Sequence, residues 1–338
     1  MAKDYYSSGR RSGLFYPTLK PARLRRYNIE KGERTSFPQL KWEYTCKFLM
    51  KKKKKPNIGR LIDLALSSSG EQAVSFINEI LEVMPENTEA LLLLADNTED
   101  ISEREKILLR ALKSLEEDRN YYIDDKDYLV YAAKFRLSYT YFMAGKFADA
   151  LTICEDALKV ADDPYEERKM KSLYYRTLIE LKEWQKILAL TMRDETHDLS
   201  WGYSRLIAAW MTAPGKNQNV CAHMFWDALI LAPDVPFYML GYYAEPEEDD
   251  DEYDDFDFAM MYCDAIGISE ELQQWITRGT IIFGLLTNRF DEREREYLLD
   301  VLDTLGGYEE YERMSGILLE VDDESVIEAL AANKCLSN

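Results

Sequence analysis

The sequence predicts an all-α fold in which helical hairpins stack into a solenoid. Three observations lead to this prediction. Apolar residues recur at helical spacing from residue 57 to about residue 232, without the alternation of β-branched residues that strands show. Turn signals interrupt this pattern at intervals of one helix length. The same small and apolar residues return at fixed offsets, which is typical of stacked structural repeats.

Length and composition indicate a water-soluble chain with a substantial core. The 338 residues are 46% hydrophobic, which suffices for one elongated domain or two compact ones. The five cysteines are an odd number, are far apart and form no CxxC pair, and the first residues contain no apolar signal segment. No run reaches the roughly 18 apolar residues of a membrane helix. We therefore expect an intracellular protein, cytoplasmic or nuclear, with reduced thiols and no membrane insertion.

The charges divide the chain into a basic arm and an acidic body. The first 60 residues contain 17 Lys and Arg against four Asp and Glu, whereas the remaining residues contain 25 against 58. Residues 1–56 also contain four prolines and a run of five lysines, so we expect a largely irregular arm. The body should repel nucleic acid and anionic membranes, and the arm should attract them or fold back onto the body.

The expected helices follow one another with short links. Turn signals at Gly70, Pro85, Gly145, Pro164 and Pro233 separate several of them. Short links between helices of this length favour antiparallel helical hairpins. From residue 57 to the acidic run, the expected helices lie near 57–67, 71–84, 87–97, 101–117, 127–144, 147–161, 165–181, 183–192, 198–212 and 217–231.

Small residues at regular positions provide the clearest repeat signal. Ala150 and Ala157 lie two turns apart on the apolar face of the helix 147–161, between larger side chains. Ser138 lies on the apolar stripe of the preceding helix, and we expect these small side chains to let the two helices approach closely. The interval of seven recurs between Ala73 and Ile80 and between Cys221 and Ala228, each time with a proline five residues further on.

The hairpin around Gly145 resembles a tetratricopeptide repeat, a unit of two helices and about 34 residues. Such repeats form a right-handed α-solenoid, so the resemblance implies this handedness here, with the other repeats degenerate. The repeat-like region covers about half of the chain. The positions that agree in residue type and spacing are Leu137, Tyr141, Gly145, Phe147, Ala150, Ala157 and Pro164.

A second resemblance covers roughly residues 174–285. The segments "LYYRTLIELKEWQKILAL", "YSRLIAAWMTA" and "APDVPFYML" follow the order of elements in the suppressor of tumorigenicity 7 family, with Ala232 where that family tends to have Asn. Animal members carry hydrophobic membrane segments, which this chain lacks. The resemblance implies an interaction role without known chemistry.

A run of acidic residues separates two helical parts. Ten of the thirteen residues 245–257 are Asp or Glu, which predicts an exposed, mobile insertion at 242–257. The run lacks the spacing of a calcium-binding loop. The expected domains are the arm 1–56, the repeats 57–241, this insertion, and capping helices in 258–338. Those helices are expected near 256–266, 269–286, 291–305, 308–319 and 323–334.

Motifs for catalysis are missing from the sequence. The two histidines, His197 and His223, have no partners at zinc-site spacing, and His223 is expected in the core or at its boundary. No nucleophile elbow, phosphate-binding loop or dinucleotide fingerprint occurs. We therefore expect no catalytic residues, no metal and no cofactor, and hence no enzyme. An active site without a sequence signature is the third alternative.

The expected function is protein–protein interaction, as an adaptor or scaffold. In a solenoid of helix pairs, the first helix of each pair lines an inner groove, which would hold a peptide or helix of a partner protein. Arg and Tyr are typical interface anchors. Phe135 also fits a core position. The candidate partner-binding residues are Phe135, Tyr139, Met143, Ser172, Arg176 and Arg205.

The alternative is a nucleic-acid-associated factor. In it, the basic arm contacts RNA or DNA and the helical body recruits protein. The arm interleaves basic and aromatic residues, which suits phosphate contacts and base stacking, and its affinity should fall steeply with salt. The candidate residues are Arg25, Arg26, Lys51, Lys52, Lys53, Lys54 and Lys55.

Overall fold

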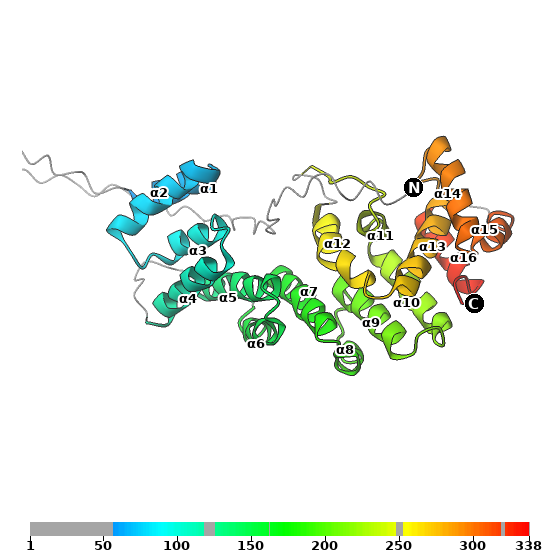
Figure 1. Ribbon diagram of the computed structural model, residues 1–338, viewed down its shortest axis with the longest axis horizontal. Helices are drawn as coiled ribbons and strands as arrows, with labels where there is room; N and C mark the ends of the chain where they lie inside the picture. Colours follow the sequence, from blue (N-terminus) through cyan, green and yellow to red (C-terminus); the bar gives the residue numbers. More distant parts are fainter. Residues whose placement is uncertain (1–56, 118–125, 162, 248–252, 319–321, 338) are drawn as a thin grey trace, which may run out of the picture. The chain divides into compact units, whose positions relative to one another are not determined.

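The computed structural model describes residues 57–117, 126–161, 163–247, 253–318 and 322–337 (Figure 1). These residues form sixteen helices and no strand, which confirms the all-α class. The chain divides into two compact units, Met1–Pro85 and Glu86–Asn338. The division falls inside the segment expected as one run of repeats.

The described part of the first unit is a single helical hairpin. Helix α1 (Ile58–Leu66) contacts α2 (Gly70–Val83). The side chain of Asn57 accepts a hydrogen bond from the amide of Arg60, which caps α1. Gly70 adopts a positive φ at the start of α2, a conformation in which glycine carries no steric penalty.

The second unit contains fourteen described helices. Most begin and end within three residues of the expected positions, but the helix expected at 147–161 ends at Ala157 and the one expected at 308–319 ends at Ser315. Their bounds are α3 (Thr88–Asp96), α4 (Ile101–Glu116), α5 (Lys126–Met143), α6 (Phe147–Ala157), α7 (Pro164–Glu180), α8 (Trp184–Thr191), α9 (Leu199–Thr212), α10 (Gln218–Leu231), α11 (Val235–Met239), α12 (Tyr253–Ile266), α13 (Glu270–Leu286), α14 (Glu292–Thr304), α15 (Tyr308–Ser315) and α16 (Asp323–Ala332).

Helices α3 to α10 pack in a regular order. Each even-numbered helix from α4 to α8 contacts the helix before it and the helix after it, and α7 also contacts α9. In Figure 1, α6 and α8 lie on one side of the row formed by α5, α7 and α9. This repetition of contacts between neighbouring helix pairs gives a repeat-like architecture.

The small residues of the sequence lie where these helices meet. Ser138, Ala150 and Ala157 are completely buried, and the hydroxyl of Ser138 donates to the carbonyl of Phe135 at 2.8 Å. Gly145 turns the chain between α5 and α6 with a φ of 70°. The amide of Lys146 then donates to the carbonyl of Tyr141, which closes the end of α5.

The "APDVPFYML" segment forms the short helix α11 rather than a simple turn. Asp234, just before α11, pairs with Arg289, which follows α13. The second guanidinium nitrogen of Arg289 lies 2.6 Å from a carboxylate oxygen of Asp323 in α16. The guanidinium carbon also lies 5.1 Å from the centre of the Phe237 ring. Arg289 therefore joins three segments that are far apart in the sequence.

Helix α12 begins inside the acidic run. Tyr253, Asp254 and Asp255 form its first turn, so the predicted insertion 242–257 is wrong at this end. Carboxylates are favourable there, because the first turn of a helix carries partial positive charge. Residues 248–252 lie outside the described residues. Helix α12 contacts α7, α9 and α11, and it lies on the side of α7 away from α6 and α8 (Figure 1).

Helix α13 runs through the core of the C-terminal part, in contact with α11, α14, α15 and α16. Two of its glycines lie close to aromatic rings. A Cβ at Gly284 would meet the ring of Phe290 at 2.4 Å, and a Cβ at Gly279 would meet Phe225 at 2.7 Å. The indole of Trp275 donates to the carbonyl of Leu336 at 3.1 Å, which ties the end of the described chain to α13.

Candidate functional site

Three of the predicted groove residues lie on α5 and differ widely in exposure. Phe135 is 3% exposed and belongs to the hydrophobic core, as its alternative interpretation stated. Tyr139 is half-buried, and Met143 is 45% exposed. Of these three residues, Met143 alone presents a largely open side chain.

The two residues on α7 lie under α12. Arg176 is 3% exposed, and its Nε donates to the carbonyl of Met261 in α12 at 3.0 Å. Its guanidinium also pairs with Glu180, and the guanidinium carbon lies 5.3 Å from the centre of the Phe142 ring. The main-chain carbonyl of Ser172 accepts a hydrogen bond from the hydroxyl of Tyr262 at 3.3 Å.

Helix α12 therefore fills the face of α7 and α9 that was expected to be an open groove. Tyr262 is completely buried, and its hydroxyl lies 2.9 Å from that of Ser204 in α9. The buried Phe256, Phe258 and Ile266 each contribute about 1.5–3 kcal/mol to holding α12 in place. The expectation that Arg176 lines an accessible groove is thus corrected, because its partner is a helix of the same chain. Ser172 is half-buried, and its hydroxyl donates to the carbonyl of Arg168 in its own helix at 3.0 Å.

Negative charge is unfavourable at this filled face. Burial raises the pKa of the Asp257 carboxyl, although Lys169, whose Nζ is 3.9 Å away, opposes the shift. Burial and the Asp257 charge also raise the pKa of the Tyr139 hydroxyl, against the effect of Arg104. The charged and hydroxyl groups around Asp257 and Tyr139 are therefore partly desolvated.

Arg205 lies in a different setting, on α9. It is half-buried, and its guanidinium carbon is 5.1 Å from the centre of the Trp201 ring. The ring of His197, which is exposed and has a φ of 46°, stacks on Trp201 at 4.4 Å. Arg205 thus contacts a buried tryptophan of its own helix.

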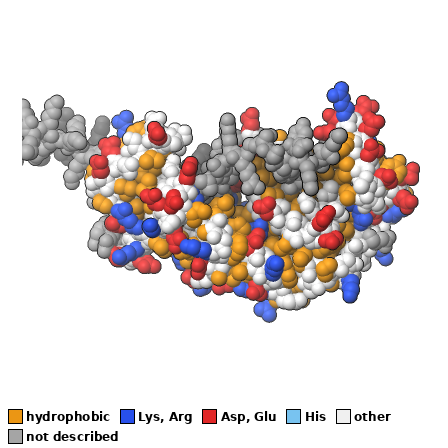
Figure 2. Space-filling view, viewed as in Figure 1, with side chains coloured by type: hydrophobic (Ala, Val, Ile, Leu, Met, Phe, Trp, Pro, Cys, Tyr) orange, Lys and Arg blue, Asp and Glu red, His pale blue; other side chains and the backbone are white. Residues whose placement is uncertain are grey.

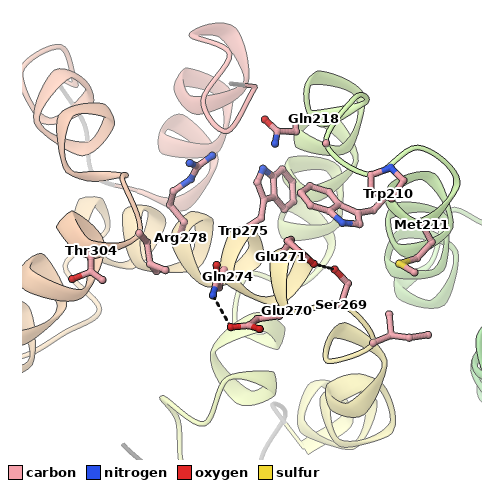
Figure 3. A pocket seen from close by; sticks show the side chains of 14 residues that line it. Trp210, Met211, Gln218, Ser269, Glu270, Glu271, Gln274, Trp275, Arg278 and Thr304 are labelled. Carbon is pink, nitrogen blue, oxygen red and sulfur yellow. Dashed lines mark hydrogen bonds between the residues drawn. The ribbon is translucent and has the colours of Figure 1, made fainter. Parts of the chain in front are cut away.

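An open pocket lies between the termini of four helices. It has a volume of about 990 Å³ and forms between the end of α9, the start of α10, the start of α13 and the end of α14 (Figure 3). Its apolar lining includes Trp210, Met211, Ile268, Trp275 and Leu305. Its polar and charged lining includes Gln218, Ser269, Glu270, Glu271, Gln274, Arg278 and Thr304.

Two tryptophans form the inner wall of this pocket. The rings of Trp210 and Trp275 lie side by side, with centres 5.2 Å apart, and the residues are 4% and 5% exposed (Figure 3). The indole of Trp275 is satisfied by Leu336, whereas the buried Nε1 of Trp210 has no hydrogen-bond acceptor among the described residues. The wall is therefore buried and largely apolar, with one donor that no described residue satisfies.

The carboxylates of the pocket stand at the start of α13. The hydroxyl of Ser269 caps the helix by accepting from the Leu272 amide at 3.2 Å, and it donates to Glu271 at 2.7 Å. Hydrogen bonds from Ser269 and from the backbone lower the pKa of the Glu271 carboxyl, so it is ionised at neutral pH. Gln274 donates to Glu270 at 3.2 Å (Figure 3).

Sequence reasoning did not find this pocket. The segment 269–286 was assigned only to a capping role, and Trp210 and Trp275 are 65 positions apart in the sequence. Both tryptophans lie on strongly apolar helices, where an aromatic residue predicts core packing. The positions of four helix ends relative to one another are set by tertiary packing, and no local pattern encodes them.

The His, Cys, Asp and Glu side chains of the described residues are candidate metal ligands and nucleophiles. No group of three or more His, Cys, Asp or Glu is placed there to hold a metal ion. Burial raises the pKa of the Cys154 thiol to about 12 and that of Cys221 to about 11, so both are protonated at neutral pH. His223, expected in the core or at its boundary, is exposed.

Comparisons with models of protein families, with curated proteins and with solved structures found no match for this chain. The two resemblances therefore rest on the residues quoted in the sequence analysis. None of the described helices combines the length and the hydrophobicity that a membrane span requires. The nucleic-acid candidates Arg25, Arg26 and Lys51–Lys55 lie outside the described residues.

Proposed function

We propose that this chain is a non-catalytic protein–protein interaction scaffold built on a right-handed, tetratricopeptide-like solenoid. The repeated contacts between successive helix pairs support the solenoid, as do the buried small residues of α5 and α6. The partner contributes a peptide segment or one end of a helix. The predicted groove over α7 and α9 is filled by α12, so the partner binds elsewhere on the same scaffold.

The observation that carries this proposal is the open pocket at the ends of α9, α10, α13 and α14. An apolar floor surrounded by a few convergent polar groups is typical of a binding site. The two tryptophans of the inner wall are buried and fixed by packing, so little conformational entropy is lost when a partner binds. Gln218 and Gln274 offer amide groups that suit hydrogen bonds to a peptide backbone.

Capture of partners by the full chain tests the proposal. Gln274→Trp places a bulky ring in the pocket, whereas Gln273→Trp places the same ring at an exposed position of α13 that does not line the pocket. We expect wild type and Gln273→Trp to retain the same proteins from a nuclease-treated extract, and Gln274→Trp to lose them. Retention of every partner by Gln274→Trp contradicts the proposal.

A second candidate function rests on the basic arm. The excess of Lys and Arg in the first 60 residues favours contact with RNA or DNA. In the described part of the second unit, acidic and basic side chains are interspersed on the face shown in Figure 2, so that face offers little to phosphates. Replacing Lys51–Lys55 by Gln should then weaken salt-sensitive binding to single-stranded RNA. Unchanged binding, or binding that salt does not affect, contradicts this candidate.

A further inference from the structure

We propose that the pocket at the ends of α9, α10, α13 and α14 recognises a basic segment of a partner protein, in which Lys or Arg adjoins a large apolar side chain. This inference rests on the proposed interaction function and adds the chemistry of the partner. Three features of the pocket support it: its charges, its apolar floor and its size.

The charges of the pocket favour a cation. Glu270 and Glu271 are exposed and lie on one rim, and the lowered pKa of Glu271 keeps its carboxylate charged. Two further exposed carboxylates, Asp264 and Asp303, lie within four residues of lining positions. The cationic groups in the same segments are the half-buried Arg278 and the exposed Lys216. The carboxylates thus outnumber the cations. Because these carboxylates are exposed, a Lys or Arg head group bound to them would keep part of its hydration.

The floor of the pocket favours an apolar side chain next to that cation. Met211, Ile268 and Leu305 are half-buried, so each still exposes apolar surface that an occupant would cover. Methionine adapts its shape to different side chains.

The size of the pocket limits the occupant to a short segment. A volume of about 990 Å³ lies at the upper end of the range for pockets that hold small molecules. It accommodates one or two side chains and the backbone between them, rather than a whole helix. The acidic excess of the body also repels nucleic-acid phosphates, which leaves a protein segment as the occupant.

Peptide binding to the full chain tests this chemistry. The probes are three fluorescein-labelled nine-residue peptides in which Phe alternates with Lys, with Gln or with Glu. We expect the Lys peptide to bind, the Gln peptide to bind at least about tenfold more weakly, and the Glu peptide to show no measurable binding by fluorescence anisotropy. Binding of the Lys peptide should weaken as salt is raised.

Two sets of variants locate the binding. Glu270→Gln with Glu271→Gln removes the rim charges and should weaken the Lys peptide about three- to tenfold. Glu292→Gln with Glu296→Gln removes two exposed carboxylates of α14, the first at the same first-turn position as Glu270, and should leave binding unchanged. Gln274→Trp should abolish binding, and Gln273→Trp should preserve it.

Other outcomes separate this inference from the proposed function. If the Glu peptide binds as well as the Lys peptide and Gln274→Trp abolishes both, the pocket is a binding site and the inferred charge preference is wrong. If the Lys peptide binds equally to Gln274→Trp, the attraction is diffuse and the pocket assignment is overturned. If Lys51–Lys55→Gln binds the peptide more tightly than wild type even at high salt, where diffuse charge attraction is screened, the basic arm of this chain occupies the pocket, which overturns the assignment to a partner.

Discussion

Helix α9 takes part in two surfaces of similar composition, and they differ in what covers them. On one face, Tyr203 and Ser204 lie under α12, next to Phe258 and Tyr262. At its end, Trp210 packs against Trp275, but the space beyond them is open. Both surfaces combine aromatic rings with hydroxyl and charged groups. The first has its partner within the chain, whereas no segment of the described residues fills the second.

Their carboxylates show the same difference. Burial under α12 raises the pKa of the Asp257 carboxyl, so its charge is unfavourable there. In the pocket, hydrogen bonds lower the pKa of Glu271, and its side chain is exposed. A charge that is stabilised and exposed is available to a partner, whereas a charge that is buried and paired is part of the fold. This distinction places the first surface in the fold, and it supports our proposal that the second serves recognition.

The largest effect should come from breaking the filled face. Tyr262→Ala removes a completely buried ring and its hydrogen bonds to Ser204 and Ser172, and we expect a loss of about 3–5 kcal/mol in the free energy of unfolding. Gln274→Trp in the pocket should change that free energy by less than about 0.5 kcal/mol, because the position is exposed. Urea denaturation followed by circular dichroism measures both. Comparable losses in the two variants contradict the distinction.

A smaller effect should separate two arginines that the sequence grouped together. Arg176→Met keeps the aliphatic stem but removes the hydrogen bond to Met261 and the ion pair with Glu180, at a cost of about 1.5–3 kcal/mol. Arg205→Met loses its contact with the Trp201 ring, at a cost below about 1 kcal/mol. The same denaturation experiment compares them. A greater loss for Arg205→Met would show that α12 does not depend on Arg176.

The sequence predicted the helices well because the information was local. The periodic apolar faces, Gly145 and the prolines placed nearly every helix within three residues. The extra helix α11 and the early start of α12, which the sequence did not predict, have local causes as well. Helix α11 contains a proline in its first turn and only five residues, and the first turn of α12 is acidic because a helix start favours carboxylates.

The sites were harder to predict because they depend on tertiary contacts. The sequence placed Arg176 and Ser172 in a groove open to a partner protein, whereas the structure buries Arg176 against a helix of the same chain. The sequence did not identify that helix as α12, which lies 85 residues beyond Arg176 at the Met261 contact. The pocket is further removed, since it arises from the ends of four helices whose directions are set by the core around α13.

The turn between α5 and α6 allows a test of the strongest local signal. Gly145 has a φ of 70°, where an alanine is strained, and a Cβ there would meet no neighbour. Gly145→Ala should therefore cost about 1 kcal/mol from backbone strain alone. Gly267→Ala, between α12 and α13, lacks a positive φ and should change stability by less than about 0.5 kcal/mol. Equal losses in thermal unfolding would mean that the αL conformation is not what Gly145 provides.

The smallest effect should appear in the pH dependence of the filled face. The pKa of Asp257 is raised above its ordinary value of 3.8, mainly by burial, so the folded chain holds this proton more tightly than the unfolded chain. Its contribution to stability is therefore most favourable below pH 3.8 and declines as the pH rises through the raised pKa. Asp257→Asn removes this decline, and at pH 7 it should be more stable than wild type by less than about 1 kcal/mol.

Denaturation of wild type and Asp257→Asn between pH 3.5 and pH 7 measures this difference directly. The two curves should nearly meet at the acidic end and separate as the carboxylate of wild type ionises, because the asparagine carries no charge at any pH. Glu292→Gln, which neutralises an exposed carboxylate of α14, is the matched control and should not show a gain that grows with pH. If Asp257→Asn is instead less stable at pH 7, the attraction to Lys169 outweighs the cost of burial. The charged cluster beneath α12 would then hold that helix in place, and the filled face would be stabilised by charge as well as by its aromatic rings.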